Sequence, residues 1–364
     1  MTADSGSSSA GTRSPADELL ARLSASPDAY PQKLDLVGDK VLLVQFDAGA
    51  YARASFLDDR ILTPTTHGAW ISVGQAVAAA RLVANPRPLH FIFHTGHVGS
   101  TLVSRLLDET GVVLSLREPL PLRTLGDAHD VLGQPESLLS GAQFDVLLAT
   151  FSYLWSRGYD LTRTVVVKAT SSAGRLASPL LARAHNARAI YMNLEAEPYL
   201  ATLLAGQNSP IDLRGHGPGR MRRLQSRIVA PLAPLHAMSI GELAAMSWLA
   251  ESWSQADALE RFADRVIALD FDRFLADVTE SMSRILRHFE LTVDGHYLSE
   301  LSRSPVLTRY SKAPEHAYTP TIRAEVLRES RSYNADEIRK GLNWLERLAR
   351  VDGGVANILN RPGG

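Results

Sequence analysis

The chain has 364 residues, of which 45% are hydrophobic and 21% are charged, and its formal net charge is -1. This charge argues against a nucleic-acid binder that relies on bulk electrostatics, and the absence of cysteine excludes disulfides, thiolate metal ligands and cysteine nucleophiles. No signal peptide and no run of 18 apolar residues is found. We therefore expect a cytoplasmic protein with neither a nucleic acid nor a membrane as partner.

The N-terminal part of the chain carries few signals of chemistry. Residues 1–30 are Ser-, Gly- and Ala-rich at their start and predict a disordered or weakly structured tail, with short helical patterning at Ala16–Leu23. Residues 31–85 predict a small extension with a strand at Lys40–Phe46 and a helix at Val73–Val83. By default, this extension is a lid or a packing element.

Residues 86–364 predict one α/β domain, because short apolar runs alternate there with longer helical stretches. This pattern is typical of a doubly wound, mainly five-stranded parallel sheet with helices on both faces. Ligands bind beyond the carboxyl ends of such strands. The five expected strands are Leu89–Phe93, Val112–Leu116, Thr164–Val167, Ala189–Met192 and Arg265–Leu269.

The segment after the first of these strands predicts an anion site. Gly96 and Gly99 allow the backbone to approach a ligand, and Ser100 and Thr101 place hydroxyls in the first turn of the next helix. The unpaired N–H groups of a helix N-terminus favour phosphate. The alternative is that the two glycines only form a tight strand-to-helix turn.

Two ionisable residues follow the next two strands. Glu118 lies at the predicted sheet edge, either as a general base for an acceptor hydroxyl or as a solvated carboxylate paired with Arg117 or Arg123. Lys168 ends an apolar run, where its charge would neutralise a transferred group; the alternative is a surface lysine.

Two basic segments lie further along the chain. Arg214 to Arg227 holds five arginines, either as a clamp for a phosphate or acidic acceptor or as an exposed mobile loop. Lys312 lies in a polar, proline-bounded loop between Arg303 and Pro320. Long helices are expected at Gly241–Phe262, Thr279–Phe289 and Ala335–Arg350.

The loop is not a Walker A motif, since its glycines are three apart and no lysine follows. The segment His97-Val98-Gly99-Ser100-Thr101 resembles the 5'-phosphosulfate loop of the P-loop-like sulfotransferases, and Leu269 to Asp277 is similar to their late strand and acidic turn. This resemblance covers roughly Pro86 to Lys312. It implies a doubly wound fold and the donor 3'-phosphoadenosine 5'-phosphosulfate.

The resemblance also implies roles for individual residues. The loop from Thr95 to Thr101 would hold the phosphosulfate, and His97 would replace the usual loop Lys or Arg. The other residues of this loop are Gly96, Val98, Gly99 and Ser100. Lys168 would match a lysine at the third strand's end. The family's catalytic His falls on Thr170, which leaves Glu118 as the base.

The 3'-phosphate site departs from the family pattern. The usual Arg and Ser fall on Leu194 and Thr202, so the hydroxyl is kept and the cation is absent. A lost charge-assisted hydrogen bond costs roughly 1.5 to 3 kcal/mol, so another residue must substitute. Lys312 and the Arg214 to Arg227 cluster are the candidates.

We therefore expect a sulfotransferase that moves a sulfuryl group from this nucleotide to a hydroxyl or amine of a small-molecule or peptide acceptor, with catalytic residues Glu118, Lys168 and His97. Thr202 and Lys312 join residues 95–101 as donor-binding residues, and no metal ligand is assigned. The alternatives are a degenerate P-loop nucleotide kinase or hydrolase, which would require Mg²⁺ ligands and a loop lysine, and a non-catalytic nucleotide-binding protein of the same fold. The oligomeric state is not predicted.

Overall fold

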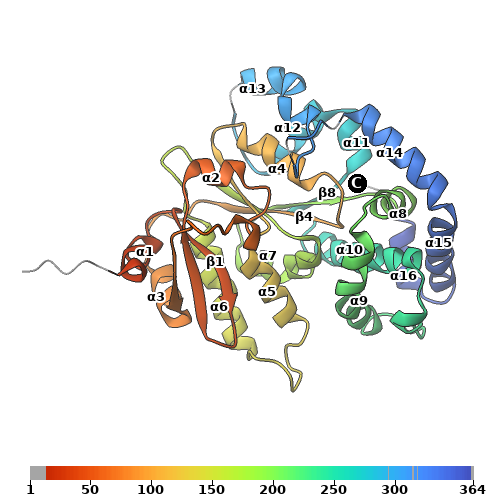
Figure 1. Ribbon diagram of the computed structural model, residues 1–364, viewed down its shortest axis with the longest axis horizontal. Helices are drawn as coiled ribbons and strands as arrows, with labels where there is room; N and C mark the ends of the chain where they lie inside the picture. The colour runs from red at the N-terminus through yellow and green to blue at the C-terminus, as the bar shows by residue number, and fades with distance from the viewer. Residues whose placement is uncertain (1–13, 294, 314, 318, 362–364) are drawn as a thin grey trace, which may run out of the picture.

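The computed structural model describes residues 14–293, 295–313, 315–317 and 319–361. Its central element is a five-stranded parallel sheet with the strand order β5-β6-β4-β7-β8 (Figure 1). The strands are β4 Leu89–His94, β5 Val113–Arg117, β6 Thr164–Lys168, β7 Ala189–Asn193 and β8 Val266–Asp270. The predicted α/β fold with a five-stranded parallel sheet is confirmed, with every expected strand in place to within a residue at each end.

The sheet is buried on both faces, as parallel sheets are. Side chains alternate between two hydrophobic cores along each strand: Phe91 and Phe93 of β4 enter one core, and Ile92 enters the other. This is why the strands appear in the sequence as continuous apolar runs rather than as alternating patterns.

Helices cover the two faces of the sheet (Figure 1). The helices of the main domain are α4 Ser100–Asp108, α5 Leu120–His129, α6 Gly141–Trp155, α7 Ala177–Arg183, α8 Ala196–Leu204, α9 Ser209–Gln225, α10 Ile240–Arg261, α11 Phe271–Ala276, α12 Val278–His288, α13 Gly295–Glu300, α14 Pro320–Tyr333, α15 Ala335–Ala349 and α16 Gly353–Leu359. Short 3₁₀ helices lie at Asp59–Ile61, Ser171–Leu176, Leu235–Ala237, Leu301–Arg303 and Pro305–Thr308. Within the described part of the chain, no helix combines the length and the apolar character that crossing a membrane requires.

A second, antiparallel sheet in the order β1-β2-β3 forms the N-terminal extension. Its elements are α1 Pro15–Leu23, β1 Ala29–Asp35, β2 Lys40–Gln45, α2 Ala48–Arg53, β3 Gly68–Ser72 and α3 Val73–Arg81. The buried side chains of this sheet share one core with α5, α6 and one face of the parallel sheet. The predicted boundary at residue 85 therefore does not separate two hydrophobic cores.

The N-terminal tail is more ordered than predicted where the structure describes it, and the helical patterning at Ala16–Leu23 is confirmed. Residues 1–13 of the predicted tail lie outside the described residues, but α1 forms a regular helix with Leu19 and Leu23 buried. Ser14 caps this helix, and its hydroxyl accepts the N–H of Asp17. Burial of these two leucines stabilises α1, a segment that composition alone assigns to a weakly structured tail.

Candidate functional site

The segment between β4 and α4 has the backbone of an anion-binding loop. Gly96, His97 and Gly99 have φ angles of +110°, +55° and +71°, a left-handed region that only glycine enters at little cost. Backbone N–H groups 96–102 find no hydrogen-bond acceptor among the described residues. Successive N–H groups left free at a helix N-terminus form a concave site for an oxyanion.

Two hydroxyls of the same segment also lack partners. Oγ1 of Thr95 and Oγ1 of Thr101 are buried and make no hydrogen bond among the described residues. A buried hydroxyl without a partner lowers the stability of the fold. In folded proteins such hydroxyls usually form a hydrogen bond with a ligand or with water. These two atoms are a signal for anion binding that is independent of the backbone geometry.

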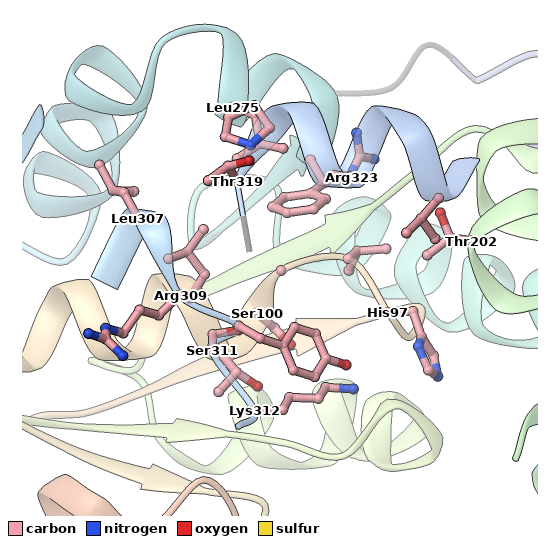
Figure 2. A pocket seen from close by; sticks show the side chains of 18 of the residues that line it. His97, Ser100, Thr202, Leu275, Leu307, Arg309, Ser311, Lys312, Thr319 and Arg323 are labelled. Carbon is pink, nitrogen blue, oxygen red and sulfur yellow. The ribbon is translucent and has the colours of Figure 1, made fainter. Parts of the chain in front are cut away.

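A cavity of about 290 Å³ opens directly at this loop. Its walls combine the loop and the start of α4 with α8, α11, the segment before α14, and α14 itself (Figure 2). Predicted site residues on its lining are His97, Val98, Gly99, Ser100, Thr101, Thr202 and Lys312. The apolar side chains on the lining include those of Phe271, Leu275, Leu307 and Leu327. The cavity thus offers both an anion site and an apolar wall for a planar group.

Lys312 supplies a cation to this cavity. Its ammonium makes no hydrogen bond or ion pair with any described residue, and in Figure 2 it lies on the loop side of the cavity together with His97. Burial lowers the pKa of Lys312, and the neighbouring Glu118 carboxylate partly offsets that effect. Lys312 is therefore a cation available to a ligand.

Arg323 is a cavity residue that the sequence analysis missed. Located in the first turn of α14, it donates to Asp272 over 2.6 Å, and its guanidinium carbon lies 5.2 Å from the centroid of the Phe271 ring. Thr202 lines the same part of the cavity (Figure 2), where its hydroxyl donates to the carbonyl of Pro198. A hydroxyl and a guanidinium thus lie together away from the loop.

Leu194 explains why the expected arginine is absent. Its side chain is buried in the core that lies under α10, and its carbonyl accepts a hydrogen bond from Nε1 of Trp248 over 2.9 Å. A charged side chain at this position would be desolvated without a partner.

Glu118 and Lys168, which lie at the ends of the adjacent strands β5 and β6, lie against each other, a pairing that the sequence analysis did not anticipate. The Lys168 ammonium forms an ion pair with the Glu118 carboxylate, and the N–H of Glu118 donates to the carbonyl of Lys168 over 2.6 Å. Glu118 has a φ of +55°, a strained value for a residue with a side chain. A backbone hydrogen bond and a side-chain ion pair therefore both hold Glu118 against Lys168.

Burial and charge oppose each other in this pair. Burial raises the pKa of the Glu118 carboxyl, but the cations of Lys168, Lys312 and Arg123 outweigh burial and hold that pKa below its usual range. Burial lowers the pKa of Lys168 to about 8, although Glu118 raises it in part. At neutral pH both groups are charged.

The pair does not line the cavity at the loop. Lys168 is fully buried, and the side chain of Glu118 is 10% exposed. The Phe56 ring of the N-terminal extension lies 5.9 Å from the Lys168 ammonium, and the Arg60 guanidinium covers the ring at 3.5 Å. The extension is therefore part of the surroundings of this pair.

His97 differs from its predicted role as a cation. Desolvation in the cavity and the positive charges of Lys312 and Lys168 lower the pKa of His97. His97 is exposed to solvent at the loop. Without a bound anion the imidazole is neutral at pH 7 and donates at most one hydrogen bond.

The arginine cluster at Arg214 to Arg227 is mostly helix α9, and none of its arginines lines the cavity, although the charge of the buried Arg220 acts on His97. Arg223 pairs with the fully buried Glu251 of α10 at 2.7 Å, and Arg227 pairs with Asp257 at 2.6 Å. These arginines fasten α9 to α10. Of the two predicted substitutes for the missing arginine, only Lys312 lies at the cavity.

Comparisons with known proteins find likenesses among solved structures only. No protein-family model matches the chain, and no curated protein does. A sulfotransferase domain from the curacin biosynthetic pathway is 12% identical with a TM-score of 0.41, and the match covers 73% of this chain and 99% of that one. At such identities and TM-scores, none of these likenesses assigns a role to a residue of this chain.

Two further sulfotransferases give similar values. A sulfotransferase domain from the olefin synthase of Synechococcus PCC 7002 is 16% identical with a TM-score of 0.37, over 67% of this chain and 94% of that one. A sulfotransferase from Mycobacterium avium is 13% identical with a TM-score of 0.38, over 88% of this chain and 96% of that one.

Proposed function

We propose that this chain is a sulfotransferase that binds 3'-phosphoadenosine 5'-phosphosulfate in the cavity at the loop and transfers the sulfuryl group to a hydroxyl or amine of a small-molecule or peptide acceptor. The observation that carries the proposal is the run of unpaired N–H groups 96–102, with the free Thr101 hydroxyl, beside a cavity whose lining is mainly apolar. The 5'-phosphosulfate would bind there, with Lys312 as its cation.

Arg323 takes the place of the cation missing at Leu194. A guanidinium presents several donors, so pairing with Asp272 leaves others for a 3'-phosphate, and Thr202 lies beside it on the lining. Phe271 and Leu327 would pack against the adenine and ribose between the two phosphate sites. Both phosphates of the donor are then matched by residues of one cavity.

The Glu118 and Lys168 pair supplies the chemistry. The acceptor oxygen or nitrogen attacks the sulfur in line, its proton passes to the Glu118 carboxylate, and the S–O bond to the phosphate breaks with its electron pair on the leaving phosphate. Lys168 would leave Glu118 and stabilise the charge that grows on that oxygen. The pKa of Lys168, about 8, makes its proton easier to share at the transition state than that of an ordinary lysine.

A non-catalytic nucleotide-binding protein is the second candidate. It is favoured by one observation, which is that Lys168 and Glu118 are tied to each other and lie off the lining of the cavity. A degenerate kinase or hydrolase is the third, and a preference for ATP with Mg²⁺ would identify it.

Calorimetry with three nucleotides tests the proposal. We expect the product 3'-phosphoadenosine 5'-phosphate to bind at least about tenfold more tightly than 5'-AMP, because one more charge-assisted contact forms, and more tightly than ATP with Mg²⁺. Release of this product from the phosphosulfate on addition of phenols, alcohols or amines then separates an enzyme from a binding protein. Binding without release for every acceptor would favour the non-catalytic candidate.

A further inference from the structure

One face of α4 holds the segment that carries Lys312. Arg105 and Glu109 are one turn apart and therefore on the same side of the helix. Nε of Arg105 donates to the carbonyl of Ser311 over 2.8 Å, and Oε1 of Glu109 accepts from the hydroxyl of Ser304 over 2.9 Å. The helix that starts at the anion loop thus fastens the opposite wall of the cavity at two points.

Arg105 also reaches the N-terminal extension. Its Nη2 donates to Oγ of Ser55 over 2.8 Å, and its Nη1 donates to the carbonyl of Ala52 over 3.3 Å. One guanidinium therefore joins three segments that are far apart in the sequence. Arg105 itself does not line the cavity, so any effect on a ligand passes through Ser311.

The segment that Arg105 holds has little regular structure of its own. Among its described residues it contains the 3₁₀ helix Pro305–Thr308, an isolated β-bridge between Arg309 and Ala317, and short-range turn hydrogen bonds such as that from the N–H of Ala313 to the carbonyl of Tyr310. Such segments open locally at low free-energy cost. Its position over the cavity then depends on the anchors along α4.

We propose that Arg105 is a positioning residue, which docks the Ser311 and Lys312 segment onto the cavity and couples that segment to the N-terminal extension. The consequence for nucleotide binding rests on the proposed function, whereas the docking itself does not. When a binding-competent state is only partly populated, apparent affinity falls by that fraction. Undocking the segment nine times in ten would weaken binding about tenfold.

The test uses hydrogen–deuterium exchange and calorimetry on full-length variants. In the free protein, Arg105→Gln should speed exchange about tenfold in peptides covering residues 304–313 and leave the exchange of β4 and β6 unchanged. The same variant should weaken binding of 3'-phosphoadenosine 5'-phosphate about tenfold. Arg105→Lys, which keeps the charge and loses the three-way fork, should behave like Arg105→Gln.

Two control variants separate docking from general stability. Arg163→Gln removes an arginine that donates to the carbonyl of Thr292 over 3.2 Å and should change neither readout. Ser55→Ala removes one of the two contacts of Arg105 with the extension and leaves those with Ala52 and Ser311 in place, so it should give a smaller change, about two- to threefold, in both readouts. It remains informative if Arg105→Gln fails to fold.

The outcomes separate the two proposals. Unchanged exchange over residues 304–313 in both Arg105→Gln and Ser55→Ala overturns the positioning role, and so does full rescue by Arg105→Lys. If the parent protein binds no adenine nucleotide, the proposed function falls, and the exchange result still decides whether Arg105 docks the segment.

Discussion

The ring of Phe271 packs directly against the backbone of Gly99, so closely that a Cβ built on Gly99 would overlap the ring carbons. Phe271 begins α11 at the end of β8, and Gly99 is the N-cap residue of α4 at the end of the anion loop. The loop is therefore held in place by the neighbouring strand end, and the same ring lines the cavity.

Gly99→Ala should abolish nucleotide binding, because the new methyl group must displace either the ring or the loop. Gly111→Ala is the matched control, since Gly111 has the same φ of +71° with no atom within 4 Å of its built Cβ. In the control, the free energy of unfolding should fall by about 1–2 kcal/mol, which is the cost of an alanine in the left-handed region. Its affinity for the nucleotide should not change. Calorimetry with denaturant unfolding checks both, and equal affinities in the two variants would contradict the account.

Lys312→Gln should weaken binding of 3'-phosphoadenosine 5'-phosphate more than His97→Gln does. A charge-assisted contact is worth about 1.5–3 kcal/mol and a neutral one about 0.5–1.5 kcal/mol, so the loss of affinity should be about tenfold or more for Lys312→Gln and about two- to tenfold for His97→Gln. Calorimetry at pH 7 measures both affinities. The reverse order would restore His97 as the cation of the loop.

Arg323→Gln should affect only ligands with a 3'-phosphate. Binding of 3'-phosphoadenosine 5'-phosphate should weaken at least about tenfold, and binding of 5'-AMP should change less than about twofold. Arg331→Gln is the control on the same helix, because Arg331 pairs with Glu197 away from the lining. Equal losses for both nucleotides would place the second phosphate elsewhere.

Lys168 should titrate with a midpoint near its pKa of about 8, well below the ordinary lysine value. The chain has only five lysines, at positions 33, 40, 168, 312 and 340, so NMR of their Cε carbons can follow it. Because Glu118 raises the pKa of Lys168, Glu118→Gln should move the midpoint to lower pH. Turnover should fall as pH rises through the same midpoint, since the protonated form is the active one. A midpoint near 10.4, the ordinary lysine value, would refute this assignment.

The parallel sheet could be predicted because strands buried on both faces are continuous apolar runs bounded by turns. Strand β1 was missed, since Pro31 interrupts its pattern and the pairing register shifts between Pro31 and Lys33. Helix α9 was left open between a clamp and a loop because glycines and Pro218 lower its helix propensity. The ion pair between Arg223 and Glu251 helps to hold it, and no local pattern reports that contact.

The candidate site was predictable only where its chemistry is local. The loop from Thr95 to Thr101 is one contiguous segment, and Glu118 and Lys168 follow neighbouring strands, so topology brings these groups to one edge. Arg323 lies in a late helix with no local signal that it turns toward Thr202. Its contribution depends on how α14 packs over α8, which is a property of the whole fold.

A crystal structure of the protein with 3'-phosphoadenosine 5'-phosphate tests the central claim most directly. The account predicts the 5'-phosphate within hydrogen-bond distance of backbone N–H groups 99–101 and of Lys312. It also predicts the 3'-phosphate on Arg323 and on Thr202, whose hydroxyl would turn from the carbonyl of Pro198 to donate to it, with the adenine ring against Phe271. A ligand bound elsewhere, or one bound at the loop with its 3'-phosphate in solvent, would contradict it.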